Sequence, residues 1–205
     1  MFEVPMSVST ESPSVERIAS IEDRLAAIES VLEDRAMQPA AFVETFNHWA
    51  TKEWIPENGA RLVAKAWCEP DFRARLLADG ITAIRELGLT MPAHHRHLVA
   101  LENTATVHNV ICCTLCSCTA FTVIGLPPDW YKDLEYRARV VRESRSVLRE
   151  MGLELAPHIE IRVWDTTADT RYMVLPERPP GTEGWSQEQL TAMVTKEGMI
   201  GVAKV

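Results

Sequence analysis

Four of the five cysteines in this 205-residue chain lie within the seven residues from Cys112 to Cys118. The spacing Cys113-x-x-Cys116-x-Cys118 places three thiols close enough to bind one metal ion, provided that the backbone folds tightly around it. Zinc is the usual partner of clustered thiolates, but structural zinc normally takes four ligands, and no second cysteine pair exists here. His108 offers a fourth ligand, although a histidine on a strand more often packs or forms a hydrogen bond. The cysteine run therefore predicts a metal loop that an ordinary zinc site explains poorly.

A second arrangement uses the tripeptide Cys116-Ser117-Cys118 as a chelate. Its two thiolates and the two amide nitrogens between them give four donors in one plane, and Cys113 then occupies one axial position. Binding a deprotonated peptide nitrogen requires a strongly Lewis-acidic metal, such as trivalent cobalt or iron. The opposite axial position stays open to water or substrate, which is what a hydration catalyst needs.

Composition limits the class of protein. With 46% hydrophobic and 24% charged residues the chain can bury one core, and it has no apolar run near the ~18 residues that span a bilayer. The net charge of −8 provides no basic stripe for phosphates, so we expect neither nucleic acid nor membrane as a partner. No signal peptide is recognisable and the cysteines are clustered, so we expect a cytoplasmic location.

Three segments are predicted along the chain. Residues 1–13 are rich in Ser, Thr and Pro and predict a flexible terminus, and residues 14–55 predict a helical arm. The arm has a narrow apolar stripe, which suits a helix packed against a partner subunit as well as one packed on its own chain. The apolar stripe of this arm consists of Ile18, Ile21, Leu25, Ile28 and Leu32. Residues 56–205 are expected to form the metal-binding catalytic domain.

The elements that position the cysteines predict an α+β fold, in which the helical arm precedes a layered α/β domain. The strand over residues 107–112 leads directly into the cysteine loop, which therefore lies at a strand end. Residues 159–163 and 171–175 are expected to form a hairpin. Ser186 and Gln189 predict a capping box at the start of a helix that ends at Gly198. The remaining expected elements are helices over 39–54, 60–67, 71–87 and 127–152, and strands over 98–101 and 199–202.

The hexapeptide Cys113-Thr-Leu-Cys-Ser-Cys118 resembles the α-subunit motif of the nitrile hydratases. The resemblance covers nearly the whole chain from about residue 40 onward. It is carried by residues 58–67, 102–104, 107–109, 125–132, 136–143, 159–163, 170–176 and 181–185.

This resemblance implies one Co(III) or Fe(III) ion per chain, bound by the sulfurs of Cys113, Cys116 and Cys118 and by the backbone nitrogens of Ser117 and Cys118. It also implies oxidation of Cys116 to sulfinate and of Cys118 to sulfenate. Thr114 resembles the cobalt version, because iron members usually have serine there. The implied reaction is hydration of a nitrile to an amide, with Cys118, Cys116 and Ser117 as the catalytic group. The metal and the Cys118 sulfenate are the reactive pair.

The resemblance also implies a substrate pocket beside the loop. Phe121 is expected to form an aromatic wall, and His94, followed by His95, stands where relatives often have a glutamine near the metal. Trp130 can reach the pocket or pack at a helix start. Two cysteines, Cys112 and Cys68, are interpreted as packing residues. A group of arginines is interpreted as a solvated or subunit-contacting face: Arg137, Arg139, Arg142 and Arg145.

Partners follow from the same resemblance. We expect a β subunit, or two smaller chains equivalent to it, and an activator or metallochaperone that inserts cobalt. One alternative is the metal subunit of a thiocyanate hydrolase, which resembles the same family. Those enzymes carry Tyr-Pro-Arg where this chain has Thr119-Ala-Phe121. A further alternative is a non-catalytic metal-binding or redox protein. Substrate identity depends largely on the partner.

Overall fold

The computed structural model describes residues 19–116 and 118–205. The chain divides into two compact units, Met1–Thr45 and Phe46–Val205. The predictions for residues 1–13, for Ile18 and for Ser117 lie outside the described residues. None of the described helices has the length and apolar content needed to cross a membrane.

The first unit contains α1 (Ile21–Asp34) and most of α2 (Pro39–His48). Ser20 begins α1 because its side chain accepts a hydrogen bond from the Asp23 N–H at 3.1 Å. The predicted helical stripe is present, but no residue of α1 or α2 is buried. Ile21, for instance, is 77% exposed. These two helices therefore carry apolar side chains that the chain itself leaves uncovered.

Two pairs of parallel strands form the centre of the second unit. Strand β1 (His97–Glu102) pairs with β4 (Thr170–Leu175), and β2 (Val107–Cys112) pairs with β3 (Glu160–Asp165). The hairpin predicted between the last two strands is wrong, because each of them joins a different earlier strand. Alternating residues identify a strand but not its partner. The predicted position of the cysteine loop is confirmed, since β2 ends at Cys112.

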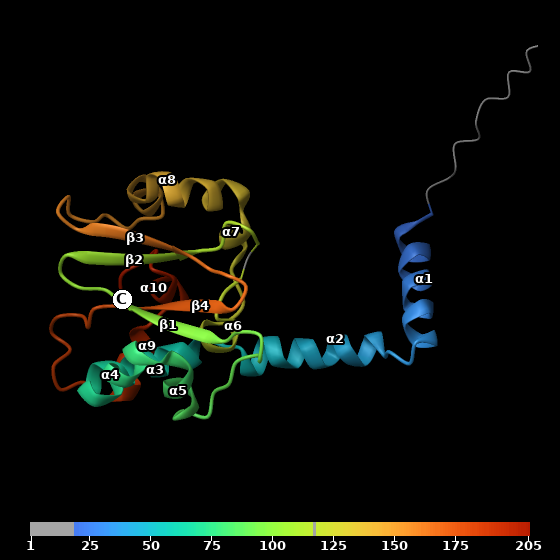
Figure 1. Ribbon diagram of the computed structural model, residues 1–205, viewed down its shortest axis with the longest axis horizontal. Coiled ribbons are helices and arrows are strands. Elements are labelled where there is room, and N and C mark those ends of the chain that lie inside the picture. The colour runs from blue at the N-terminus through green and yellow to red at the C-terminus, as the bar shows by residue number, and fades with distance from the viewer. Residues whose placement is uncertain (1–18, 117) are drawn as a thin grey trace, which may run out of the picture. The chain divides into compact units, whose positions relative to one another are not determined.

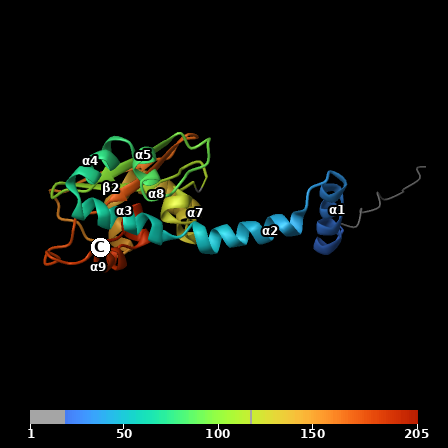
Figure 2. The ribbon, with the colours of Figure 1, turned by 90° about the horizontal axis from the view of Figure 1, so that it is seen from below.

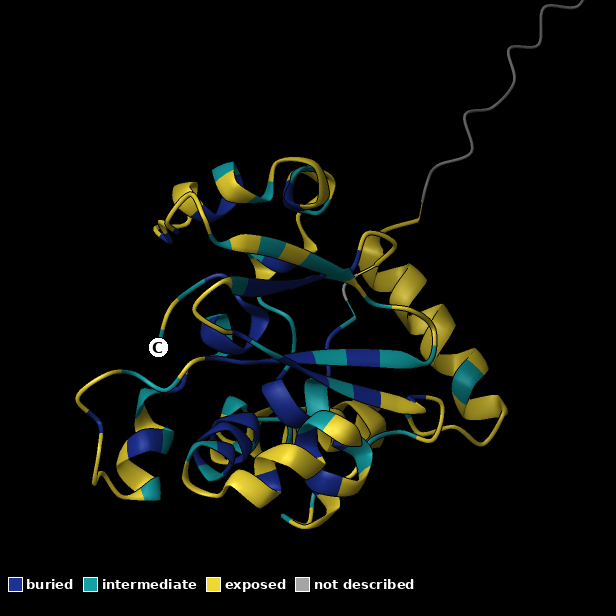
Figure 3. Ribbon diagram, turned by 60° about the vertical axis from the view of Figure 1, so that its left-hand side comes forward, coloured by how far each residue is buried: buried dark blue, intermediate teal, exposed yellow. Residues whose placement is uncertain are grey.

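Helices cover these strands on two sides (Figures 1 and 2). The long helix α8 (Leu134–Glu150) lies on the β3 side. On the β1 side lie α3 (Pro56–Cys68), α4 (Pro70–Ala78), α5 (Gly80–Arg85) and α9 (Gln187–Met193). Figure 3 shows that the strands are mostly buried or half-buried, whereas the outer helix faces are exposed. The chain is thus a mixed helix and strand protein, as predicted. The largest fully buried side chains include Phe72, Leu62, Leu76, Ile84, Ile111, Leu148 and Met173.

The helix predicted over residues 71–87 is two helices, α4 (Pro70–Ala78) and α5 (Gly80–Arg85), which follow α3 (Pro56–Cys68). The break falls at Asp79, whose backbone is extended and whose carboxylate accepts from the Thr82 N–H at 3.1 Å. Gly80 lies against β1, where an added Cβ would stand 2.3 Å from the Leu98 carbonyl oxygen. Apolar periodicity alone did not reveal this close approach.

A second predicted helix, residues 127–152, is also divided. After α6 (Phe121–Ile124) the chain forms α7 (Asp129–Lys132) and then α8 (Leu134–Glu150). Asp133 separates the last two, because its extended backbone ends α7 and its carboxylate caps the N–H groups of Glu135 and Tyr136. A five-residue π-helix, η1 (Trp49–Glu53), joins α2 to α3, where an uninterrupted helix was expected.

The C-terminal segment is helical rather than a strand. The predicted capping box of Ser186 and Gln189 is confirmed at the start of α9 (Gln187–Met193). That helix ends before Gly198, which lies inside α10 (Lys196–Ile200), so the predicted end and the final strand over 199–202 are both wrong. A short apolar run fits a buried helix turn as well as a strand, and Met199 and Ile200 are fully buried.

Candidate metal centre

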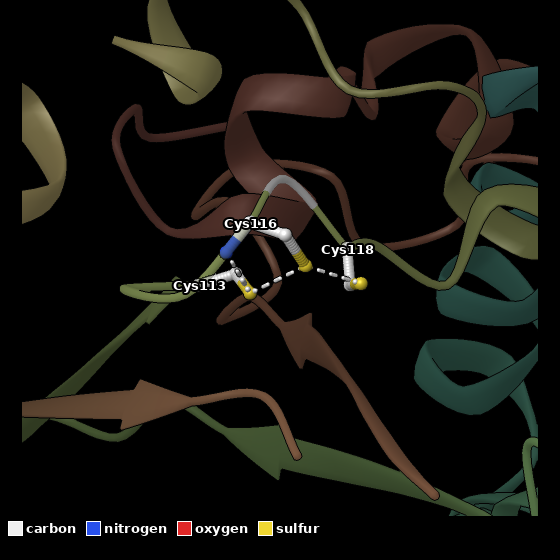
Figure 4. Close-up of side chains that lie close together, drawn as sticks. All are labelled: Cys113, Cys116 and Cys118. Atoms are coloured by element: carbon white, nitrogen blue, oxygen red, sulfur yellow. Dashed lines mark hydrogen bonds between the residues drawn. The ribbon is translucent and has the colours of Figure 1, made fainter. Parts of the chain in front are cut away.

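Three cysteine sulfurs converge directly after β2 (Figure 4). The Sγ atoms of Cys113 and Cys116 are 3.3 Å apart, and those of Cys116 and Cys118 are 2.7 Å apart. All three lie within 4.8 Å of one another. Thiolates that share one ion at a bond length of ~2.3 Å lie at most ~4.6 Å apart, and the Cys113–Cys116 and Cys116–Cys118 sulfur distances are both shorter than this, so the loop is compact enough for one metal ion. Among the described residues this is the one such group of His, Cys, Asp and Glu side chains.

Side chains from other elements hold the backbone of this loop. The carboxylate of Asp165, at the end of β3, accepts from the Thr114 N–H at 2.9 Å and from the Thr114 hydroxyl. The carbonyl of Cys116 accepts from Arg137 Nη1 at 2.7 Å, and the carbonyl of Cys118 accepts from the Tyr131 hydroxyl at 3.2 Å. Sequence reasoning missed Asp165, because its contact joins distant segments, whereas Tyr131 was expected, with Trp130, to reach the pocket or the partner or to pack at a helix start.

The surroundings of the cysteine thiols give them different pKa values. Burial acts to raise the pKa of Cys113, but the nearby Thr166 hydroxyl and the Cys116 N–H outweigh it and lower that pKa to about 7. Burial, followed by the hydrogen bond with Cys116, raises the pKa of Cys118 to about 12. Burial, together with the charge of Asp165, also raises the pKa of Cys112 to about 12. Cys112 is fully buried and keeps its proton, as expected for a packing residue.

Several buried side-chain polar atoms have no hydrogen-bond partner within residues 19–116 and 118–205, and two of them belong to arginines that act on the cysteine loop. Arg171, at the start of β4, donates through Nη1 to the carbonyls of Thr167 and Thr170, but its Nε has no partner. Its charge acts on both Cys118 and His95. Arg137, which donates to the Cys116 carbonyl, also has an unpaired Nε. Buried polar atoms are normally paired, so these two guanidinium groups are available for a further polar contact near the loop. The unpaired atoms also include His95 Nδ1 and Thr122 Oγ1.

The structure does not use His108 as a ligand. Its Nε2 is 2.7 Å from the Gly201 carbonyl oxygen, and its Nδ1 is 3.2 Å from Asn103 Nδ2. Because both ring nitrogens are engaged away from the cysteines, the zinc hypothesis with His108 as fourth ligand is wrong. Burial lowers the pKa of His108, which keeps the ring neutral.

Phe121 begins α6, shortly after the loop, and joins a row of aromatic rings. Its ring centroid is 5.7 Å from that of the buried His95 and 4.7 Å from that of Trp54. His94 is exposed and stacks edge-on against His95 at 4.3 Å. Trp54 follows the π-helix and was not predicted as a site residue. We call Trp54, Phe121 and His95 the aromatic row.

Asn58 fixes this row by joining two segments. Its side-chain amide donates to the carbonyl of Glu53 at 2.6 Å and to the carbonyl of Thr122 at 3.1 Å. The next residue, Gly59, allows α3 to approach α6, because an added Cβ would lie 3.0 Å from the Val123 carbonyl oxygen. The Asn58-Gly59 pair therefore brings the end of the π-helix against the start of α6.

Other predicted residues have different surroundings. Trp130 packs against Tyr136, with ring centroids 5.0 Å apart, beside a cavity of about 250 Å³ along α8. Cys68, expected to pack, is exposed at the end of α3. The arginine group is engaged within the chain: Arg139 pairs with glutamates of α8, and Arg145 donates to the carbonyls of Leu155, Ala156 and Ile159.

Together these features define a mixed helix and strand protein with a thiolate metal site in a loop at a strand end. A family model described as "Nitrile hydratase, alpha chain" matches residues 19–203. The chain therefore belongs to the nitrile hydratase α-chain family, a family of enzyme subunits that carry the catalytic metal centre.

Relatives of known name agree. The nitrile hydratase subunit alpha of Rhodococcus sp is 47% identical over 94% of this chain and 96% of its own length. A cobalt-containing nitrile hydratase subunit alpha from Pseudonocardia thermophila is 46% identical over 87% of this chain and 88% of its own. The thiocyanate hydrolase subunit gamma of Thiobacillus thioparus is 35% identical over 94% of this chain and 83% of its own.

A solved structure shares the fold. It is a double mutant of the Fe-type nitrile hydratase from Comamonas testosteroni Ni1, in which two adjacent histidines are replaced by alanine. The identity is 53%, the TM-score is 0.86, and 89% of each chain is covered.

Proposed function

We propose that this chain is the metal-bearing subunit of a nitrile hydratase, which adds water across the carbon–nitrogen triple bond of an organic nitrile to give an amide. The convergence of the Cys113, Cys116 and Cys118 sulfurs in one loop carries this proposal. Membership of the nitrile hydratase α-chain family supports it.

The proposed metal is low-spin Co(III), one ion per chain. Its ligands are the three cysteine sulfurs and the backbone nitrogens of Ser117 and Cys118, with Cys116 as sulfinate and Cys118 as sulfenate. Thr114 and the cobalt-containing relative support cobalt. Fe(III) is the alternative, supported by the Fe-type relative and by its adjacent histidines, a feature that this chain shares in His94 and His95. Elemental analysis separates the two.

When bound, the metal supplies a Lewis acid that polarises the nitrile or a water molecule. The chain supplies the remaining groups. Oxygen on the Cys118 sulfur acts either as nucleophile toward the nitrile carbon or as base that takes a proton from the attacking water, and Cys116 and Ser117 complete the catalytic group. The buried cation of Arg171 acts on Cys118 and stabilises negative charge at that sulfur. Tyr131 and Asp165 hold the loop in the geometry described above.

The substrate pocket is proposed to lie beside the aromatic row. Phe121 forms its wall and His94 lies near its rim, while Trp130 contributes from α7. A neutral aromatic surface favours an organic nitrile over a small anion. Burial, followed by the charges of Arg171 and His94, lowers the pKa of His95 to about 4, so that this ring is neutral near pH 7.

The arm over residues 14–55 is proposed to contact the partner, which is a β subunit or two smaller chains equivalent to it. The apolar residues that α1 and α2 leave exposed support this assignment, because exposed apolar patches mark protein contacts. An activator or metallochaperone is proposed to insert the metal in the cytoplasm. The exposed set includes Ile21, Leu25, Ile28, Val31, Phe42 and Val43.

The test is an activity assay of the chain purified together with its partner. We expect amide formation from an organic nitrile, little activity from this chain alone, and no release of ammonia from thiocyanate. Thiocyanate hydrolysis without nitrile hydration contradicts the proposal and supports the alternative function suggested by the thiocyanate hydrolase relative. Inactivity of the metal-loaded complex toward both substrates supports a non-catalytic metal protein.

A further inference from the structure

One arginine of helix α8 contacts the cysteine loop. Asp133 fixes the start of this helix, since its carboxylate accepts from the N–H groups of Glu135 and Tyr136 at 2.7 and 3.0 Å. Arg137 follows within the first turn, is half-buried, and donates from Nη1 to the Cys116 carbonyl oxygen at 2.7 Å. A cationic donor at this distance makes a charge-assisted hydrogen bond.

The accepting carbonyl has a particular chemical position. It belongs to the peptide group that joins Cys116 to the nitrogen of Ser117, which is one of the two backbone nitrogens in the proposed ligand set. When a metal binds a peptide nitrogen, electron density moves toward the oxygen of the same group. That oxygen then becomes a stronger acceptor, and a guanidinium donor stabilises it more than a neutral donor does.

Arg137 differs from the other arginines of α8. Arg139 is paired with Glu135, Glu143 and Glu150. Arg142 donates from Nε to the Ala138 carbonyl of its own helix at 3.0 Å. No carboxylate within 4.0 Å of the Arg137 guanidinium is found in the part of the chain that the structure describes, and its buried Nε has no hydrogen-bond partner there. Its charge is therefore directed to the cysteine loop rather than to an acidic neighbour.

We propose that Arg137 is a positioning residue of the metal centre, which strengthens metal binding by holding and polarising the Cys116–Ser117 peptide group. This inference rests on the proposed function, since it assumes that the Ser117 nitrogen binds the metal. It assigns a role to a residue that touches neither the sulfurs nor the substrate. Tyr131 instead holds the Cys118 carbonyl, whose peptide group contains the nitrogen of Thr119 and so no proposed ligand.

The experiment measures how much cobalt the full-length chain retains after it is produced with its partner in cobalt-containing medium and then dialysed in air against a chelator, because the trivalent ion is the one that binds a peptide nitrogen. Three variants are compared with the unaltered chain. Arg137→Met removes the donor but keeps much of the side-chain volume, Arg137→Lys keeps a positive donor, and Arg142→Met is the matched control from the same helix. The thiolate-to-cobalt absorption band is recorded for each, and thermal unfolding of the metal-free chains checks that they fold.

We expect Arg137→Met to retain about tenfold less cobalt than the unaltered chain, Arg137→Lys to restore part of that loss, and Arg142→Met to leave the cobalt content unchanged. Equal retention by Arg137→Met and the unaltered chain overturns the role of Arg137, but leaves the metal site of the proposed function standing. Equal loss in the Arg137→Met and Arg142→Met variants also overturns it, because the effect is then general damage to α8.

Two further outcomes are decisive. If the unaltered chain produced with its partner retains no cobalt, both this inference and the proposed cobalt site fail. If Arg137→Met does not fold, the comparison of Arg137→Lys with the unaltered chain carries the test, since an ammonium group cannot reproduce the guanidinium geometry. Unchanged cobalt retention and an unchanged absorption band in that variant then contradict the proposal.

Discussion

The buried polar groups at the two ends of β2 differ in whether they have hydrogen-bond partners. At its first residues, His108 and Asn109 belong to a closed network. Asn103 Oδ1 accepts from the Asn109 N–H at 2.7 Å, and Asn109 Oδ1 accepts from the indole N–H of Trp164 at 2.9 Å. With His108 bonded to Asn103 and Gly201, every ring nitrogen and amide of this network has a partner.

At the other end, β2 leads into the cysteine loop, where some buried donors have no partner. Among the described residues, the buried side-chain atoms without a partner include Nε of Arg137, which donates from Nη1 to the Cys116 carbonyl, and Nε of Arg171, whose charge acts on Cys118. A satisfied network stabilises a fold, whereas unsatisfied buried polar groups cost stability and mark a site where function requires them. The comparison assigns structure to one end of the strand and chemistry to the other.

The largest expected effect tests the chemical end. Replacing Cys113 by Ala removes one sulfur ligand, so the metal content should fall from about one ion per chain to near zero. Cys112→Ala is the control, because this neighbouring thiol is buried and lies outside the group of converging sulfurs. Elemental analysis of both purified variants measures the effect. Retention of metal by Cys113→Ala, or its loss in Cys112→Ala, breaks the assignment.

The opposite end should respond in stability rather than in metal content. Asn103→Ala leaves the Asn109 N–H and the Nδ1 atom of His108 without partners, which should lower the free energy of unfolding by about 2–3 kcal/mol. Urea unfolding measures this loss, and the exposed Asn47→Ala is the control with little expected change. The metal content of Asn103→Ala should stay normal. A loss of metal at unchanged stability contradicts the division between the two ends.

The aromatic row should affect which nitriles the enzyme prefers. Trp54 contacts Phe121 edge-on, so Trp54→Ala should loosen that ring and change the ratio of kcat/KM for an aromatic against a small aliphatic nitrile by about tenfold. The assay uses the chain with its partner, and Trp185→Ala, an exposed tryptophan, serves as control. An unchanged ratio in Trp54→Ala shows that the row does not contribute to the pocket.

The smallest expected effect is a pH dependence of stability. The pKa of His95 falls from its ordinary value of 6.5 to about 4 on folding, because of burial and then the charges of Arg171 and His94. Between these values the unfolded chain binds more protons than the folded chain, so stability should rise from pH 4 to about pH 6.5 and be lost on acidification. His95→Gln should flatten this rise. Urea midpoints at several pH values check it, and an identical slope in the variant is the contrary result.

Local patterns allowed a good part of this molecule to be predicted. The strand that leads into the cysteines and the Ser186–Gln189 capping box depend on neighbours in sequence, and the structure confirms both. The structure also brings the three sulfurs together, while the metal that they would hold stays a prediction. The strand partners depend on contacts far along the chain, so the expected hairpin was wrong.

The same reason explains the missed parts of the site. Asp165 reaches Thr114 across 51 positions, and Trp54 meets Phe121 only because a π-helix and Asn58 place it there. Arg137 stood among three other arginines on one helix, and its sequence position did not distinguish it. Helix breaks at Asp79 and Asp133 arise from caps that compete with helix continuation, which apolar periodicity does not report.

The most direct test of the account is elemental analysis of the purified protein, combined with the mass of the peptide that spans Cys112 to Cys118. The account predicts about one cobalt ion per chain, and a peptide mass increased by a sulfinate at Cys116 and a sulfenate at Cys118. Iron with the same oxidised cysteines changes only the metal. Zinc with unmodified thiols contradicts the central claim and returns the loop to a structural metal site.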